Sequence, residues 1–207
     1  LGNLERKHKE SLAINISGPA GSMKTRLSFQ FADELLTDGL IVGYASLEEH
    51  CESALFRGKE DQYIKPQNLD RFYPFSDLPE TFSQFVKIIS QCDAFFIDSW
   101  QKLVEKYGNI NYDTQFRKAI DGKILFTIFQ ETSDGKTRGG SKTTFDGDII
   151  LKVEVTPEDY KQNFAYAKKN RYETIPNAKY YIHDKKLVTP ADEKADQMPT
   201  SLELSLT

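Results

Sequence analysis

The sequence contains few cysteines and no long apolar run. Two cysteines, Cys51 and Cys92, occur among its 207 residues, and neither lies in the CxxC or Cys/His spacing that metal sites need. No apolar segment approaches the ~20 residues of a membrane-spanning helix, and the polar N-terminal segment LGNLERKHKE lacks the apolar core of a signal peptide. We therefore expect neither a structural zinc site, nor a secreted disulfide scaffold, nor a membrane partner, and we expect a soluble, cytoplasmic protein.

The sequence also lacks a strong excess of charge of one sign. Its formal net charge is −4 and its isoelectric point is near 5.5, so any binding of an anion must come from a local cluster of residues. A hydrophobic content of 39% over this length fits one α/β domain. We expect that domain to cover residues 1–189, followed by a flexible acidic tail over residues 190–207.

Apolar patterning alternates between strands and helices in the first half of the chain. Strand-like runs cover residues 12–17, 40–46, 94–97 and 124–129. Helical spacing of apolar residues covers residues 24–37, 82–89 and 112–120. The polar segment 51–79 predicts loops and short helices. The pattern indicates an α/β fold with a mostly parallel central sheet flanked by helices.

The second half of the chain is mostly strands. Apolar residues alternate with polar ones over residues 149–154, and short strand-like runs follow at 164–168 and 179–183. A turn at 184–185 leads into residues 186–188, which predicts a terminal hairpin. The fold therefore carries extra C-terminal β-strands beside its central sheet.

A phosphate-binding motif lies between the first predicted strand and the first predicted helix. It consists of Gly18, Pro19, Ala20, Gly21, Ser22, Met23, Lys24 and Thr25, with Arg26 next in the helix. In a Walker A loop the backbone N–H groups wrap the phosphates of ATP, the lysine reaches the β and γ oxygens and the hydroxyl holds Mg²⁺. Met23 stands where glycine is usual, so its side chain must be accommodated close to the phosphates. The alternative interpretation is an ordinary glycine turn before a helix.

Three acidic residues follow predicted strands and complete a nucleotide site. Asp98 ends the apolar run 94–97, as a Walker B acid does when it bonds the Mg²⁺ shell. Glu48 and Glu49 follow the strand that ends at Ser46, at the carboxyl edge where α/β proteins place ligands, and either can orient or deprotonate the attacking water. The alternatives are a helix cap for Asp98 and a solvated helix start for the two glutamates.

The order of these motifs resembles the ATPase core of the RadA/Sms family of RecA-like P-loop NTPases. The resemblance covers roughly residues 10–188 and rests on GPAGSMKT, YASLEEH, FFIDSWQ, ILFTIFQ, GGSKTTFDGDIILKVE and AKKNRY. It implies that Glu48 is the catalytic glutamate, that Gln130 senses the nucleotide state and that the loop 131–147 faces DNA. The KNRY segment is similar to the family's KNRFG motif, whose basic residues, here Lys169 and Arg171, act across a subunit interface. Glu173 replaces the glycine of that motif, and the family's zinc-binding cysteines and protease-like domain are absent from this sequence.

The loop 131–147 carries the candidate contacts to DNA. Lys136, Arg138 and Lys142 alternate with glycines, and such a cationic, pliable segment can follow a phosphate backbone. A solvated connection is the alternative interpretation. The complete prediction is a Mg²⁺-dependent ATPase that acts on single-stranded DNA as a homo-oligomer, with a hexamer implied by resemblance. The alternatives are a nucleotide-binding protein that has lost turnover and a KaiC-like signalling ATPase that does not bind DNA.

Overall fold

The computed structural model describes residues 11–108, 110–132, 146–173 and 177–192. Its strands are β1 (Leu12–Gly18), β2 (Val42–Ser46), β3 (Phe72–Phe75), β4 (Ala94–Asp98), β5 (Ile124–Gln130), β6 (Ile149–Glu154), β7 (Phe164–Asn170), β8 (Lys179–Tyr181) and β9 (Lys186–Val188). Its α-helices are α1 (Lys24–Thr37), α2 (Ala54–Tyr63), α3 (Phe82–Ser90) and α4 (Trp100–Tyr107). Shorter helical turns cover Pro66–Arg71, Tyr112–Arg117 and Tyr160–Gln162.

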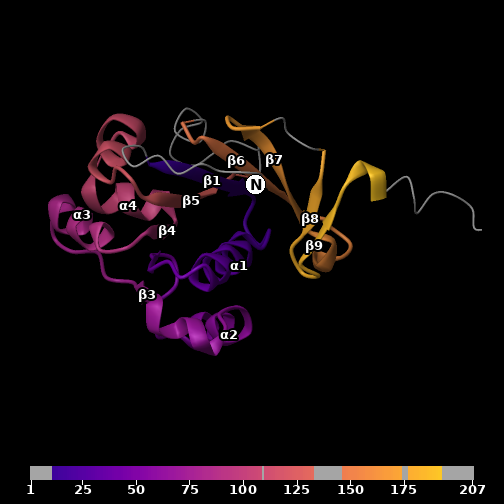
Figure 1. The fold of residues 1–207 in the computed structure, drawn as a ribbon, viewed down its shortest axis with the longest axis horizontal. Helices are drawn as coiled ribbons and strands as arrows, with labels where there is room; N and C mark the ends of the chain where they lie inside the picture. Colours follow the sequence, from indigo (N-terminus) through magenta and orange to yellow (C-terminus); the bar gives the residue numbers. More distant parts are fainter. Residues whose placement is uncertain (1–10, 109, 133–145, 174–176, 193–207) are drawn as a thin grey trace, which may run out of the picture.

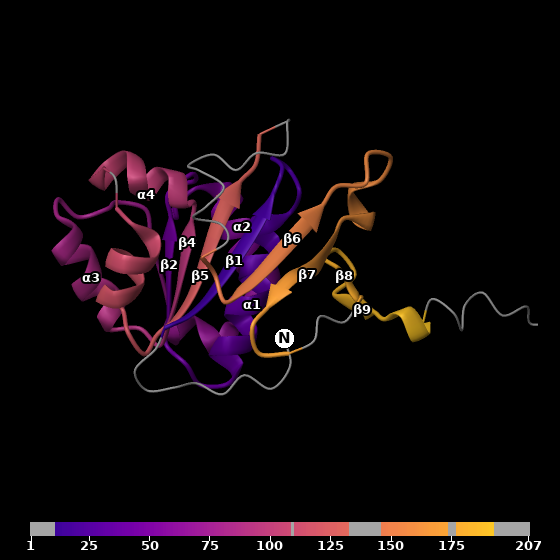
Figure 2. The same cartoon turned by 90° about the horizontal axis from the view of Figure 1, so that it is seen from above.

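The strands form one sheet in the order β3-β2-β4-β5-β1-β6-β7-β8-β9. Strands β1 to β6 pair in parallel, whereas β7, β8 and β9 are added antiparallel. Figure 2 shows the parallel strands side by side, pointing to the top of the view, with β7 pointing the opposite way. The predicted α/β class, the mostly parallel sheet, the added C-terminal strands and the terminal hairpin are all confirmed.

Each face of the sheet is covered by its own pair of helices. Helices α1 and α2 pack on one face, where α1 contributes Leu27, Phe29, Ala32 and Leu36 to a core that includes Tyr44, Phe96 and Phe126. Helices α3 and α4 cover the other face through Phe85, Ile89, Trp100 and Leu103. The two pairs lie on different sides of the strands in Figure 1. Every residue of β2 and β4 is buried, as expected for strands that are covered on both faces, and this explains why both segments are mostly apolar.

Helix α1 begins and ends as the sequence predicts. Its apolar residues recur at helical spacing, and Gly39 follows its last turn with φ of +87°, a left-handed conformation that glycine adopts without steric cost. The helix directs its N-terminal N–H groups toward the end of β1. This arrangement is the one that a phosphate-binding loop requires.

Three elements differ from the sequence prediction. Strand β2 begins at Val42 instead of residue 40, and Ile41 is a partly exposed residue before it. Strand β3 lies within the segment predicted as loops and short helices; it is a short edge strand that contains Pro74, and proline is tolerated at an edge because its missing N–H costs no ladder bond. Helix α4 follows Asp98 without a counterpart in the prediction. Residues 193–207 of the predicted tail lie outside the described residues.

Candidate active site

The phosphate loop is shaped by two glycines. Strand β1 ends at Gly18, and an added Cβ there would lie 2.7 Å from the Val153 backbone oxygen and 2.9 Å from Ser22 Oγ. Only glycine therefore allows β6 and the loop to approach the end of β1 this closely. Gly21 has φ of +74°, which favours glycine for a different reason, the turn of the backbone.

Met23 takes a left-handed backbone conformation, which is one that favours glycine. Its φ is 77° and its ψ is 19°, in the left-handed region, and it is the N-terminal cap residue of α1. Its side chain is 8% exposed and belongs to the core between α1 and the sheet. The methionine therefore keeps the turn of the motif and directs its side chain into the protein interior.

Lys24 is folded back onto its own loop. Its Nζ donates hydrogen bonds to the carbonyl oxygens of Gly18 (2.9 Å) and Pro19 (2.6 Å) and contacts Ser22 Oγ at 3.4 Å. Burial lowers the pKa of Lys24, while the nearby carboxylates of Asp98 and Glu48 act in the opposite direction. The ammonium is thus held at the start of the loop by groups that a phosphate can replace.

Thr25 and Asp98 meet across the end of the sheet. The Thr25 hydroxyl donates a 2.7 Å hydrogen bond to Asp98 Oδ2. The pKa of Asp98 is raised from 3.8 to about 6, chiefly by burial; the charge of Glu48 also raises it, whereas the hydrogen bond from Thr25 and the charge of Lys24 lower it. A hydroxyl and a carboxylate are hard oxygen ligands of the kind that Mg²⁺ prefers, so these two residues fit the predicted metal.

Glu48 lies on the same edge of the sheet, between two donors. Ser99 Oγ donates to its Oε1 at 2.5 Å, and Gln130 Nε2 donates to its Oε2 at 2.6 Å. Ser99 follows Asp98 directly at the end of β4, and Gln130 is the last residue of β5. The three neighbouring strands β2, β4 and β5 thus supply one connected carboxylate site.

Glu49 is directed away from this cluster. Its carboxylate forms an ion pair with Lys59 of α2 and accepts a 3.0 Å hydrogen bond from the Ser53 hydroxyl. Its backbone oxygen also accepts a 2.5 Å bond from Ser46 Oγ. The two adjacent glutamates therefore have different environments, and Glu48 is the one that shares the site with Asp98 and Gln130.

The remaining predicted loop residues lie around Lys24. Ser22 is buried, Pro19 and Arg26 are partly buried, and Ala20 is exposed. The candidate DNA contacts Lys136, Arg138 and Lys142 lie outside the described residues.

Two features beside the loop were not anticipated from the sequence. Ser99, which holds Glu48, has a local signal because it lies inside the FFIDSWQ motif. The other is an ion pair between Glu131 and Lys152, whose side chains are 8% and 17% exposed. Glu131 N also donates to the Gly18 carbonyl at 3.1 Å. No local pattern reveals this pair, because it depends on β6 lying beside β1.

The basic residues Lys169 and Arg171 lie at the opposite end of the strands from the phosphate loop. Asp148 directly precedes β6, which runs parallel to β1, so Asp148 lies where the parallel strands begin and not where the phosphate loop follows them. Arg171 Nη1 donates to Asp148 Oδ1 at 3.0 Å, and Lys169 Nζ donates to the Gly147 carbonyl at 2.7 Å. The structure therefore does not bring these two residues to the phosphate loop of their own chain.

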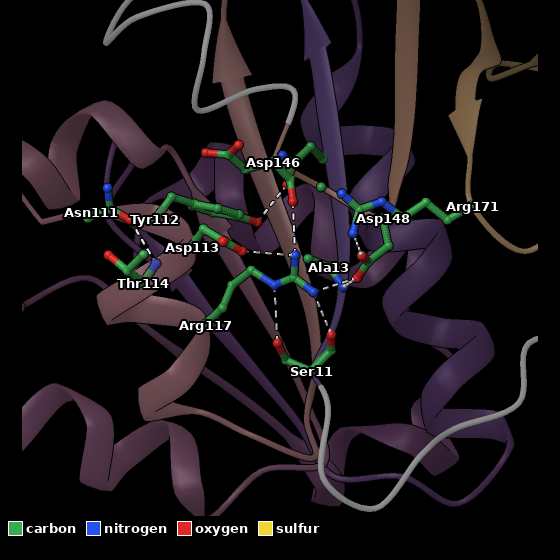
Figure 3. A network of polar contacts seen from close by, with 12 residues as sticks. Ser11, Ala13, Asn111, Tyr112, Asp113, Thr114, Arg117, Asp146, Asp148 and Arg171 are labelled. Atoms are coloured by element: carbon green, nitrogen blue, oxygen red, sulfur yellow. Dashed lines mark hydrogen bonds and ion pairs between the residues drawn. The ribbon is translucent and has the colours of Figure 1, made fainter.

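A partly buried arginine, Arg117, holds this end of the sheet together, as Figure 3 shows. Arg117 forms an ion pair with Asp148 at 2.7 Å and donates to the backbone oxygens of Ser11 (3.0 Å) and Asp146 (2.9 Å). Asp148 Oδ2 also accepts a 2.9 Å bond from the Ala13 backbone N–H. Arg117 and Asp148 thus join the starts of β1 and β6, and Arg171 contacts the same carboxylate from β7's side.

The described part of the chain contains neither a cluster of metal-binding side chains nor a helix that could span a membrane. Among these residues, no group of three or more His, Cys, Asp or Glu side chains is arranged to hold a metal ion. None of the described helices is long and apolar enough to cross a membrane. A Mg²⁺ ion at Thr25 and Asp98 would need further oxygen ligands, such as the phosphates of a nucleotide and water.

Comparisons with known proteins support the fold. No protein-family profile matches the chain, and no curated protein sequence matches it. Among solved structures, the KaiC-like protein PH0186 from Pyrococcus horikoshii is similar with a TM-score of 0.65 at 13% identity, over 87% of this chain and 89% of that chain. The flagellar accessory protein FlaH from Methanocaldococcus jannaschii is similar with a TM-score of 0.61 at 15% identity, over 86% of this chain and 92% of that chain. The strand order and these similarities together show that the chain has a RecA-like α/β fold.

Proposed function

We propose that this protein is a Mg²⁺-dependent ATPase whose active site is the edge of the sheet formed by the phosphate loop, Asp98, Glu48 and Gln130. The observation that carries the proposal is the connected set of contacts there. Thr25 bonds Asp98, Ser99 and Gln130 both bond Glu48, and Lys24 lies in the same loop as Thr25. A structural turn before a helix would not require a buried lysine, a buried aspartate and a glutamate at one place.

Each residue has a chemical role in this proposal. Lys24 would exchange the Gly18 and Pro19 carbonyls for phosphate oxygens, since a charged acceptor binds an ammonium more strongly than a neutral one. Thr25 and Asp98 would hold the Mg²⁺ shell, and the ion would neutralise charge on the phosphates. Glu48 would orient the attacking water and accept its proton, and Gln130 would detect whether the γ-phosphate is present. The hydrogen bond from Gln130 to Glu48 supports this proposed role.

The test is steady-state hydrolysis of ATP by the purified protein in Mg²⁺, beside a Lys24→Ala variant. Turnover that disappears in the variant supports the assignment. ATP binding without turnover in the unmodified protein would instead favour a nucleotide-binding protein with a degenerate site, an alternative motivated by Met23 and Glu173. Turnover that is equal in both proteins would reject the phosphate loop as the site.

We further propose that Lys169 and Arg171 complete the site of a neighbouring subunit in a homo-oligomer. Within their own chain they lie at the edge of the sheet away from the phosphate loop, and the Arg171 side chain is 55% exposed. Inactive Glu48→Gln and Arg171→Ala variants should regain part of the activity when mixed, because an intact Glu48 can then meet an intact Arg171. Glu48→Gln mixed with Lys24→Ala is the matched control. It should stay inactive, since those residues belong to one subunit's site.

The partner on which the ATPase acts has two candidate classes. The resemblance to RadA/Sms favours single-stranded DNA bound through Lys136, Arg138 and Lys142. The similarity in fold to a KaiC-like protein favours a signalling ATPase that does not bind DNA. Stimulation of turnover by single-stranded DNA, with salt-dependent binding that weakens when these three residues are replaced by alanine, would select the first class. Turnover that is indifferent to DNA, together with no detectable binding at low salt, would select the second.

A further inference from the structure

Tyr44 carries its hydroxyl group into an aromatic part of the core. The residue lies in the middle of β2 and is 0% exposed. Its ring stacks on Phe96 at a centroid distance of 5.5 Å and packs against Phe29 at 5.0 Å. A phenylalanine would satisfy this packing, and a buried hydroxyl costs free energy unless it is hydrogen-bonded. The hydrogen-bond partners of the Tyr44 hydroxyl therefore indicate why a tyrosine is present here.

The partners of that hydroxyl belong to both motifs of the candidate active site. Tyr44 Oη lies 2.7 Å from Ser28 Oγ and donates to Asp98 Oδ2 at 3.4 Å. Ser28 Oγ donates to the Thr25 carbonyl at 2.7 Å. Because a serine has one hydroxyl hydrogen, and that hydrogen is directed to Thr25, the hydrogen of Tyr44 is shared between Ser28 and Asp98. The Tyr44 hydroxyl thus contacts Asp98 directly and reaches the Thr25 backbone through Ser28.

The two hydroxyl donors meet the same oxygen of Asp98. Thr25 Oγ1 donates to Oδ2 at 2.7 Å, and Tyr44 also approaches Oδ2. The carboxylate is held from one side and its second oxygen remains available to ligands of the site. A carboxylate that can rotate must lose that freedom when it binds a metal shell, whereas one that is already held does not.

We propose that Tyr44 is a positioning residue for the metal, and that its hydroxyl fixes the Asp98 carboxylate in the orientation that receives the Mg²⁺ shell of a bound nucleotide. This inference rests on the proposed function of the site. It assigns to Tyr44 no contact with the nucleotide. Its effect is confined to the additional affinity that Mg²⁺ gives to nucleotide binding.

The test compares ADP affinity in Mg²⁺ with ADP affinity in EDTA, by isothermal titration calorimetry, for the unmodified protein and Tyr44→Phe. The variant keeps the ring and removes only the hydroxyl. We expect Tyr44→Phe to lose about tenfold in Mg²⁺, the factor that corresponds to one hydrogen bond to a charged group. In EDTA the two proteins should bind ADP equally. A general loosening of the fold would instead lower both affinities, and that result would overturn the proposal.

Two further variants sharpen the comparison. Tyr112→Phe is the matched control, because Tyr112 is also buried and its hydroxyl donates to Asn15 Oδ1 at 2.6 Å, in the helix-covered core on the other face of the sheet. It should leave the Mg²⁺ dependence unchanged. Ser28→Ala removes the competing acceptor, so Tyr44 still donates to Asp98 and the Mg²⁺ dependence should be retained.

The outcomes separate this inference from the function on which it rests. If the unmodified protein binds ADP more tightly in Mg²⁺ and Tyr44→Phe does so to the same extent, the role of Tyr44 is rejected and the nucleotide site stands. If the unmodified protein binds no nucleotide in either buffer, both are rejected. A loss of the Mg²⁺ effect in Tyr44→Phe but not in Tyr112→Phe or Ser28→Ala supports the proposal.

Discussion

Gln130 donates a 2.6 Å hydrogen bond from its side-chain amide to Oε2 of Glu48, although 82 residues separate them in the chain. The contact joins the end of β5 to the segment after β2 across the intervening strand β4. In the proposed function Gln130 detects the γ-phosphate and Glu48 orients water, so the contact would connect these two roles directly. Removing either partner should therefore affect hydrolysis more than nucleotide binding.

The adjacent glutamates give the sharpest test of this arrangement. Glu48→Gln should lower kcat by about 100-fold or more, the usual contribution of a general base, and leave ADP affinity nearly unchanged. Glu49→Gln loses only a partly exposed ion pair with Lys59 and should keep most of the turnover. Steady-state ATPase assays and ADP titrations on both variants measure the difference. A large loss of kcat in Glu49→Gln alone would move the base to Glu49.

Lys24 should contribute mainly to nucleotide affinity. Lys24→Ala removes the buried ammonium that lies against Gly18 and Pro19, and ADP affinity should fall about 10- to 100-fold, as expected for hydrogen bonds to a charged group. Lys123→Ala is a suitable control, since Lys123 directly precedes β5 at its opposite end and its ammonium donates to the Ser90 carbonyl at 2.9 Å. Fluorescence titration with a labelled ADP measures both variants. Equal losses in the two would show a nonspecific charge effect.

Asp98 should make stability depend on pH in the nucleotide-free protein. Its pKa is raised from 3.8 to about 6 by burial, so the folded state binds the proton more tightly than the unfolded state between these values. The free energy of unfolding should therefore fall as pH rises through this window, by up to about 3 kcal/mol, and Asp98→Asn should remove that dependence. Urea unfolding in EDTA at several pH values measures it. A constant difference between the two proteins across the window would contradict the raised pKa.

Met23 combines an unfavourable left-handed backbone with the favourable burial of its side chain. A left-handed backbone costs a non-glycine residue about 1 to 2 kcal/mol, whereas removing a buried methionine side chain costs about 2 to 5 kcal/mol. Met23→Gly should therefore lower the free energy of unfolding despite relieving the backbone. Met23→Ala should be at least as unstable, because alanine keeps the strain at φ of 77° and also loses the side chain. Thermal unfolding of the three proteins gives the order, and an alanine variant more stable than the glycine variant would argue against the left-handed turn.

The pair between Arg117 and Asp148 should be essential for stability, and it should not affect ADP binding at the phosphate loop of the same chain. Asp148→Ala breaks a pair in which Asp148 and Arg117 are 5% and 13% exposed, and leaving the partly buried arginine without this partner costs up to about 3 to 5 kcal/mol. Asp113→Ala removes an exposed partner of the same arginine and should cost below about 1 kcal/mol. Urea unfolding measures both variants. An unchanged ADP affinity in folded Asp148→Ala would show that this pair does not support the phosphate loop of its own chain.

The sequence predicted the parts of the fold that have a local signal. Helix α1, the strands around it and the terminal hairpin follow from spacing and turn residues within each segment. The phosphate loop and Asp98 were also predictable, because each combines a residue type with its position at the end of a strand. Met23 was identified as a departure, but its left-handed backbone and buried side chain depend on the packing between α1 and the sheet.

What escaped prediction depends on contacts between distant segments. Strand β3 is stabilised by pairing with β2 at the edge of the sheet, and its four residues have no alternation to detect. The Glu131 and Lys152 pair requires β6 to lie beside β1, and the Arg117 and Asp148 pair requires the starts of both strands to meet. Residue type and position alone did not separate Glu48 from Glu49, since neighbouring positions in a sequence do not say which side chain turns to the site. Only the resemblance to RadA/Sms favoured Glu48.

One carbonyl oxygen at the start of the phosphate loop accepts two hydrogen bonds. The Gly18 oxygen accepts both the ammonium of Lys24 at 2.9 Å and the backbone amide of Glu131 at 3.1 Å. If Lys24 turns to a phosphate, that oxygen loses one donor and the amide of Glu131 keeps it alone. The rate at which this amide hydrogen exchanges with deuterium would then differ between the nucleotide-free and nucleotide-bound protein, at the first residue after β5 and ahead of the segment that leads to β6. A spectroscopist could thus follow the state of the loop through a single backbone hydrogen without labelling the nucleotide.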